Sequence, residues 1–242
     1  MTEMAALAGI AFLGALVFGI TGFGAALVSI PLATHLVSLK FALALFVLVD
    51  LACALAVGLE KPRNALRAEW TRLVPMIVVG TVLGVTLLVN LPRRLGMVLL
   101  GIFIIAFAVY SLARHAPRIV SSRWAWLAGL GGGLTSTLFG AGGPPYAIYL
   151  SQRGLTKEQF RATLGLATLT SISLRLVAFF LTGMLLDLRV WEVALAAVPA
   201  GLLGIAVSRR IYLRLSRESL LRAVAVMLLA SGGSLLWRAL HG

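Results

Sequence analysis

Two ionisable side chains lie deep inside apolar stretches of the chain, where a charge is costly. Asp50 is ten residues from Lys40 and ten from Glu60, so a helix would place it about 15 Å from either boundary. Arg175 lies about 18–21 Å from the two ends of its own apolar segment. A charge at this depth of a bilayer costs about 2.5–3.5 kcal/mol on the insertion scale, which makes both residues functional candidates.

Three roles are open for this pair. Asp50 and Arg175 could form an ion pair that only holds two helices together, because buried charges need partners. Alternatively, Arg175 neutralises an anionic substrate, or Asp50 carries a coupling proton. A substrate that competes with Asp50 for Arg175 would combine the last two roles.

A second feature is the break in the apolar run at 132–150, which reads GGLTSTLFGAGGPPYAIYL. Glycine and proline disfavour helix, so this stretch predicts non-helical backbone, which lipid tolerates only where it is buried in protein or lines a wet cavity. Half-helices beginning after Gly24 and Pro145 would aim free N–H groups at such a cavity and favour an oxyanion. The candidate substrate-binding residues are Gly22, Phe23, Gly24, Thr137, Gly140, Ala141, Gly142, Gly143, Pro144, Ser171 and Arg175.

The composition indicates a multi-pass membrane protein. Of 242 residues, 60% are hydrophobic and 12% charged, and the mean hydropathy is +1.02. The net charge of +13 comes from basic residues spread over short loops, which argues against nucleic-acid binding. The single cysteine and three scattered histidines predict no metal centre, no cofactor and no catalytic triad, and therefore no enzyme.

Eight apolar segments divide into two similar halves. The first and fifth segments are longer than the others and align at an offset of 118 residues, with Gly22 on Gly140 and Gly24 on Gly142. Further along, Gly84 falls on Gly204 at an offset of 120. We therefore expect a first repeat over 1–118 and a second over 119–242 within one membrane domain. The segments are 4–37, 41–59, 73–91, 95–112, 124–150, 160–185, 190–207 and 220–236.

Basic residues predict which segments cross the membrane. If all eight crossed, nine basic residues would face eleven, which follows no rule. If the two glycine-interrupted segments enter and leave on the same face, 15 basic residues share one side and five the other, a strong positive-inside bias. Three crossings per half invert the second repeat relative to the first, as in many transporters. We therefore expect an all-α fold of two inverted repeats, each a re-entrant segment plus three transmembrane helices.

The paired motifs GITGFGAALVSIPL at 19–32 and GAGGPPYAIYL at 140–150 resemble the sulfite exporter TauE/SafE family of membrane permeases. The resemblance covers essentially the whole chain. It implies transport of small sulfur-containing anions, such as sulfite or organosulfonates, across the bacterial cytoplasmic membrane.

Together these features predict a secondary transporter, and export in particular, with alternating access at a midplane site formed by the two glycine-rich breaks. A proton or sodium ion would be the coupling ion, and the lipid bilayer the surroundings; a homodimer is a further expectation. The alternatives are a transporter or channel for another small anion such as a carboxylate, uptake in place of export, and a membrane assembly factor that transports nothing.

Overall fold

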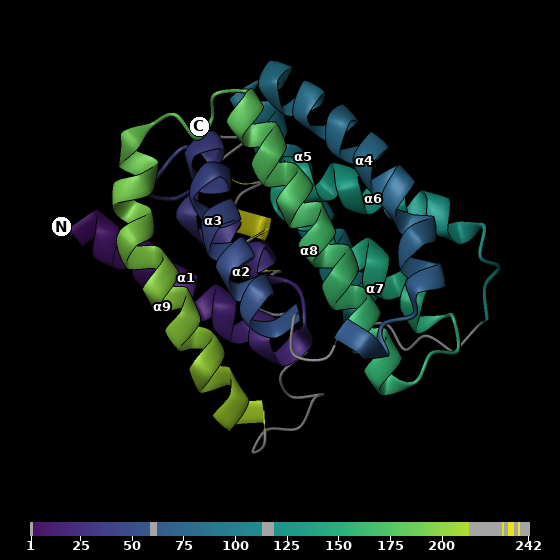
Figure 1. Ribbon diagram of the computed structural model, residues 1–242. Coiled ribbons are helices and arrows are strands. Elements are labelled where there is room, and N and C mark those ends of the chain that lie inside the picture. Colours follow the sequence, from purple (N-terminus) through teal and green to yellow (C-terminus); the bar gives the residue numbers. More distant parts are fainter. Residues whose placement is uncertain are drawn as a thin grey trace.

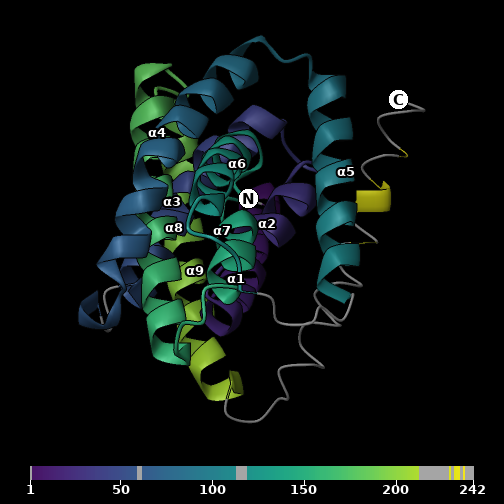
Figure 2. The ribbon, with the colours of Figure 1, turned by 90° about the vertical axis from the view of Figure 1, so that its right-hand side faces the viewer.

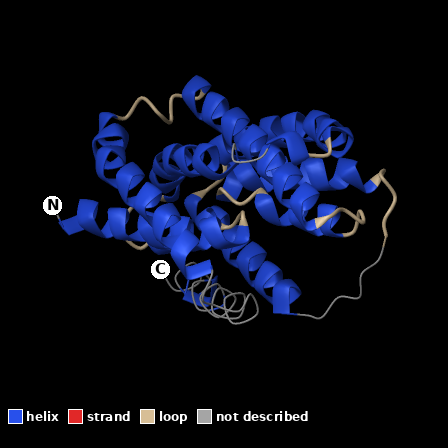
Figure 3. Cartoon of the chain, turned by 60° about the horizontal axis from the view of Figure 1, so that its bottom comes forward, coloured by secondary structure: helices blue, strands red, loops and turns tan. Residues whose placement is uncertain are grey.

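The structure is a computed structural model that describes residues 2–58, 62–112 and 119–212, together with 229, 232–234 and 237. Every regular element in this part of the chain is a helix, as Figure 3 shows, so the predicted all-α fold is confirmed. Most of the expected segment at 220–236 lies outside the described residues. The helices are α1 (Thr2–Thr21), α2 (Ala25–Ala33), α3 (Leu39–Gly58), the short 3₁₀ helix η1 (Pro62–Asn64), α4 (Arg67–Asn90), α5 (Arg93–Leu112), α6 (Trp124–Phe139), α7 (Gly143–Ser151), α8 (Lys157–Leu181) and α9 (Leu188–Tyr212).

Two of the predicted apolar segments are each split into two helices. Gly24 separates α1 from α2 with a φ of 92°, and Gly140 ends α6 with a φ of 71°. Residues with a side chain rarely adopt this left-handed backbone conformation, which is why glycine occupies both positions. The second break differs from the prediction in one respect. The half-helix α7 begins at Gly143, so Pro145 lies inside its first turn. Proline is tolerated there because an N–H in the first turn has no intrahelical acceptor.

Each split segment turns back toward the end of the molecule at which it began. Glu3 at the start of α1 and Leu36 just after α2 line the same surface pocket. Val120, shortly before α6, donates its N–H to the carbonyl of Gln152, which directly follows α7, at 3.1 Å. Both helix pairs α1–α2 and α6–α7 are therefore hairpins with a tip inside the protein.

The two hairpins open at opposite ends of the helical bundle. The start of α8 lies beside η1, as the hydrogen bond from Asn64 Nδ2 to the Glu158 carboxylate at 3.2 Å shows. The helix α8 has 25 residues and is about 37 Å long. Just beyond its other end, Arg189 pairs with Glu3 of α1 at 2.6 Å. The α1–α2 hairpin thus opens at the far end of α8 from the loops at 62–66 and 152–156.

Among the described residues, five helices are long and apolar enough to cross a membrane: α1, α3, α4, α8 and α9. In α5 the apolar stretch Arg94–Tyr110 is shorter. The helix α1 meets the length criterion, and α2 carries the chain back toward the end at which α1 began. The protein is a multi-pass membrane protein.

The helices pack as two pairs around a central pair. In Figure 1, α1 and α9 lie together on one side, α4 and α6 lie together on the other, and α3 and α8 lie between them. The helix α3 also contacts α9, as α8 contacts α4. The two halves of the chain therefore make equivalent contacts: α1 packs on α9 as α6 packs on α4, and α3 packs on α9 as α8 packs on α4. The helix α5 stands apart from the main bundle in Figure 2, and Phe103 of α5 stacks on Phe139 at the end of α6 with ring centroids 5.5 Å apart.

In each outer pair, glycines allow the two helices to approach until their backbones are in contact. A Cβ on Gly80 would overlap the carbonyl oxygen of Leu130 in α6, and a Cβ on Gly204 would overlap that of Phe12 in α1. Small residues at such crossings are typical of membrane helix packing. Leu130 and Phe12 are themselves 118 residues apart, the offset of the two split segments.

This contact corrects the alignment of the two halves. The sequence alignment pairs Gly84 with Gly204, whereas in the structure Gly204 makes the contact equivalent to that of Gly80, one helical turn earlier. The offset for this helix is therefore 124, which also places Pro199 of α9 on Pro75 of α4. Gly80 and Gly84 lie four residues apart and share a helix face, so the sequence alone could not decide which of them corresponds to Gly204.

Candidate functional site

The two hairpin tips touch each other in the interior of the bundle. A Cβ on Gly140 would come within 2.7 Å of the Cβ of Ala26 and within 2.9 Å of Arg175 Nη1. A Cβ on Gly143 would overlap the side chain of Phe23 in the other tip. The missing side chains at these two glycines allow tips from opposite halves of the chain to meet.

A cavity of about 20 Å³ lies between the tips. This volume is about what one water molecule needs. Its walls come from both hairpins and from the central helices α3 and α8. The lining residues are Phe18, Phe23, Gly24, Ala25, Ala26, Asp50, Ser136, Gly140, Ala141, Gly142, Gly143, Tyr146, Thr168, Ser171 and Ile172.

A buried ion pair stands behind this cavity. Arg175 Nη2 lies 2.7 Å from Asp50 Oδ2, and the exposed fractions of the two residues are 1% and 4%. The other terminal guanidinium nitrogen, Nη1, donates to the carbonyl oxygen of Ser136 at 3.0 Å. That carbonyl lies in the last turn of α6, where the helix dipole is negative. Arg175 therefore links α3, α6 and α8 in the middle of the protein.

The ion pair leaves hydrogen-bonding capacity unused. Within the described part of the chain, Asp50 Oδ1 and Arg175 Nε have no hydrogen-bond partner, although both atoms are buried. Unsatisfied buried polar atoms are rare in proteins because each costs free energy. Asp50 also lines the cavity. The pair is thus equipped to accept a polar ligand.

A tyrosine closes the cavity on the α7 side. Tyr146 is fully buried and donates its hydroxyl proton to Ser171 Oγ at 3.1 Å. Its ring lies against Gly132, where a Cβ would overlap the ring atoms. This explains one glycine of the run before the second break: it makes room for an aromatic side chain of the partner half-helix.

The structure brings most of the candidate residues predicted from the sequence to this cavity. Those that line it are Asp50, Phe23, Gly24, Gly140, Ala141, Gly142, Gly143 and Ser171. Arg175 lies directly behind Asp50. Three others lie elsewhere. Gly22 lies in the turn before the first tip, Pro144 is buried in the first turn of α7, and the hydroxyl of Thr137 donates to the carbonyl of Gly133 at 3.0 Å.

Sequence reasoning missed several residues of the lining. Ala25 and Ala26 follow the first glycine break directly, so their position could have marked them. Tyr146 follows the two prolines and gave no such signal. The aromatic and aliphatic walls, Phe18 and Ile172, look like ordinary core residues in the sequence.

A second buried charge holds the opposite end of the α6–α7 hairpin. Glu69 of α4 is 2% exposed, pairs with Arg153 at 2.9 Å, and accepts a hydrogen bond from the hydroxyl of Tyr149. Arg72 also pairs with this carboxylate, at 2.6 Å. The hydrogen bond to Glu69 raises the pKa of Arg153, which therefore stays cationic. The cluster fastens α7 to α4, because Tyr149 of α7 and Arg153 just after it both contact the Glu69 carboxylate of α4.

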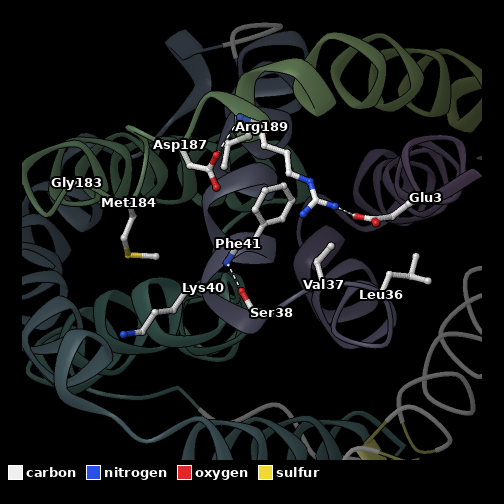
Figure 4. A pocket seen from close by; sticks show the side chains of 11 residues that line it. Glu3, Leu36, Val37, Ser38, Lys40, Phe41, Gly183, Met184, Asp187 and Arg189 are labelled. Carbon is white, nitrogen blue, oxygen red and sulfur yellow. Dashed lines mark hydrogen bonds and ion pairs between the residues drawn. The ribbon is translucent and has the colours of Figure 1, made fainter. Parts of the chain in front are cut away.

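A larger pocket, of about 670 Å³, lies at the end of the molecule where α1 begins. Figure 4 shows the Arg189 side chain extending from beside Asp187 to Glu3, with the ring of Phe41 beside its guanidinium, while Lys40 points away from this group. Arg189 lies 5.3 Å from the centroid of the Phe41 ring. Two basic and two acidic side chains line this pocket, so it has no excess of positive charge for an anion.

These observations define a class of protein: a helical membrane transporter in which two interrupted helices meet at a buried, charged site. The chain belongs to the sulfite exporter TauE/SafE family, whose model matches residues 7–235.

One similar protein of known description is the "Probable inner membrane transporter protein TsaS" of Comamonas testosteroni. It is 28% identical over 172 residues, which cover 69% of this chain and 72% of that protein. No solved structure matches the chain.

Proposed function

We propose that the protein carries small sulfur-containing anions, such as sulfite or organosulfonates, across the bacterial inner membrane by alternating access. The observation that carries the proposal is the Arg175–Asp50 pair at the meeting point of the two tips. The description of the Comamonas testosteroni relative as an inner membrane transporter agrees with this function and location. The name of the family favours export.

The chemistry of the cavity suits an oxyanion. Arg175 supplies a positive charge with a planar set of donors, which matches the oxygens of a sulfonate as it does those of a carboxylate or phosphate. The first N–H groups of α2, at Ala25 and Ala26, have no intrahelical partner, and both residues line the cavity. Ser171 adds a hydroxyl. The start of α7 contributes less than the sequence suggests, because its two prolines have no N–H to donate.

Alternating access follows from the size of the cavity and the direction of the hairpins. A space for one water molecule cannot hold a sulfonate, so the tips must separate for an anion to enter. Because the hairpins open at opposite ends of α8, withdrawal of either tip would expose the site to a different side. The exchange-symmetric helix contacts support two inverted repeats over 1–118 and 119–242 as the basis of this motion.

The function is tested by ligand-induced stabilisation of the purified protein. We expect sulfite, sulfoacetate, taurine or isethionate to raise the melting temperature, and acetate to raise it less. The matched controls are Arg175→Ala, which should abolish the shift, and Arg123→Ala, an exposed arginine whose loss should leave it intact. No shift with any anion would contradict the proposal, and saturable counterflow in proteoliposomes would separate a carrier from a channel.

The orientation is tested by labelling with a membrane-impermeant thiol reagent in a Cys53→Ala background. We expect Asn64→Cys to be labelled from the cytoplasmic side and Asp187→Cys from the other. Labelling of both from one side would contradict the inverted arrangement.

A further inference from the structure

We propose that Asp50 takes up a proton when an anion binds to Arg175, so that one proton and one monovalent anion cross the membrane together. This inference rests on the proposed function and names the coupling ion of the same site. It depends on the geometry of the buried pair and on the charge that the site must hold in each state.

The first step is the charge of the site without substrate. Asp50 and Arg175 lie 2.7 Å apart and are 4% and 1% exposed, so together they form a neutral unit. A buried charge without a partner is strongly disfavoured. In the proposed cycle both side chains are therefore ionised in the empty site, which carries no net charge.

The second step is the charge of the site with an anion. An anion on Arg175 would leave three charges, two negative and one positive, and so a net negative charge in the interior. Binding of a proton from water to a carboxylate oxygen of Asp50 removes that excess, while Arg175 keeps its proton. The loaded site is then neutral again and can move across the membrane without an uncompensated charge.

Asp50 has the position that this exchange requires. Asp50 is one of the residues that line the cavity, and within the described residues its Oδ1 has no hydrogen-bond partner. A proton reaching the cavity with the anion could bind there without first breaking the contact of Oδ2 with Arg175. Protonation would then weaken that contact and release the guanidinium to the anion.

No neighbouring group offers an alternative proton acceptor of similar strength. The described titratable or charged side chains that face this pair are Cys53, one turn along α3, and Tyr146 of α7, whose ordinary pKa values lie far above that of a carboxyl group. The residues of α2 and α1 at the cavity, such as Ala26 and Phe18, are apolar, and α9 approaches α3 through Gly201. On α8, Ser171 carries a neutral hydroxyl that accepts the hydrogen bond of Tyr146, and a hydroxyl is far less basic than a carboxylate.

The first test measures proton uptake by the wild-type protein. Isethionate is a suitable probe, because its sulfonate stays ionised at all accessible pH values and any proton must bind to the protein. Calorimetric titration in two buffers of different ionisation enthalpy should show uptake of about one proton per anion, and the dissociation constant should rise about tenfold per pH unit while Asp50 is ionised.

The outcomes separate the inference from the proposed function. Binding of isethionate without proton uptake overturns the inference and leaves the transport function standing. Absence of isethionate binding overturns the inference as stated, and absence of binding by every anion of the panel removes the proposed function with it. A requirement for sodium in place of the proton also overturns the inference.

The second test uses Asp50→Asn, which imitates the protonated carboxyl group. We expect isethionate binding with little dependence on pH and exchange of labelled for unlabelled isethionate across proteoliposomes, but net transport reduced at least tenfold, because the empty site now carries an unpaired Arg175. Glu192→Gln, an exposed acid-to-amide change on α9, should behave as wild type. Net, proton-linked transport by Asp50→Asn would overturn the inference.

Discussion

Removing the Arg175–Asp50 pair one residue at a time and then together separates its structural contribution from its transport function. At an effective dielectric constant of about 20, charges about 4 Å apart attract by about 4 kcal/mol. Desolvation of two ions that are 1% and 4% exposed offsets most of this gain. The intact pair should therefore contribute little net stability, whereas a single unpaired charge should be costly.

We expect Arg175→Met and Asp50→Leu each to lower the free energy of unfolding by about 3–5 kcal/mol, because each leaves its partner buried and uncompensated. At about 2–4 °C per kcal/mol for a chain of this size, the apparent melting temperature should fall by about 6–20 °C. The double variant should be more stable than either single variant, because no charge remains to be desolvated. Arg123→Met, on the surface, should change stability by no more than about 0.5 kcal/mol.

The assay is thermal unfolding in detergent, followed by intrinsic tryptophan fluorescence, together with anion counterflow in proteoliposomes. Stability should recover in the double variant while counterflow stays absent. If the two single effects simply add in the double variant, the residues do not interact as the structure shows. If the double variant still transports, the pair is only structural and the assignment of the site is wrong.

Two further predictions concern the α6–α7 hairpin. Gly132→Ala places a Cβ inside the ring of Tyr146 and should destabilise the protein by about 1–3 kcal/mol, whereas the adjacent Gly131→Ala meets open space and should stabilise it by up to about 1 kcal/mol; equal melting temperatures would contradict this packing. Tyr149→Phe removes the hydroxyl that donates to the buried carboxylate of Glu69 and should cost about 1–3 kcal/mol, measured as above; an unchanged melting temperature would mean that water or another group satisfies the carboxylate.

The helix breaks and the central charges could be predicted from the sequence because each breaks a rule of the lipid environment. Gly140 ends a helix that lipid would otherwise favour, and charges at Asp50 and Arg175 lie where none is expected. The distribution of basic residues likewise predicted that each split segment returns to the end at which it began. These signals concern position along the chain, which the sequence records directly.

The remaining parts of the site depend on helix rotation and register, which the sequence does not record. The fit of Tyr146 against Gly132 and the contact of Ala26 with Gly140 arise only once two half-helices are placed side by side. Glu69 lies at the end of a segment and looks like a loop charge, although it is buried. The alignment at Gly204 was wrong by one turn for a similar reason. Gly80 and Gly84 lie on one helix face, and a sequence pattern cannot tell which of them corresponds to Gly204.

The central claim, that an anion binds where the two tips meet, is tested most directly by substrate protection of Ala141, a buried residue of the cavity wall. In a Cys53→Ala background, Ala141→Cys would be labelled with a small methanethiosulfonate reagent in the presence and absence of saturating sulfoacetate, with the exposed Asp187→Cys as control. We predict that sulfoacetate slows labelling at Ala141→Cys severalfold and leaves Asp187→Cys unchanged. Equal labelling of Ala141→Cys with and without the anion would contradict the claim.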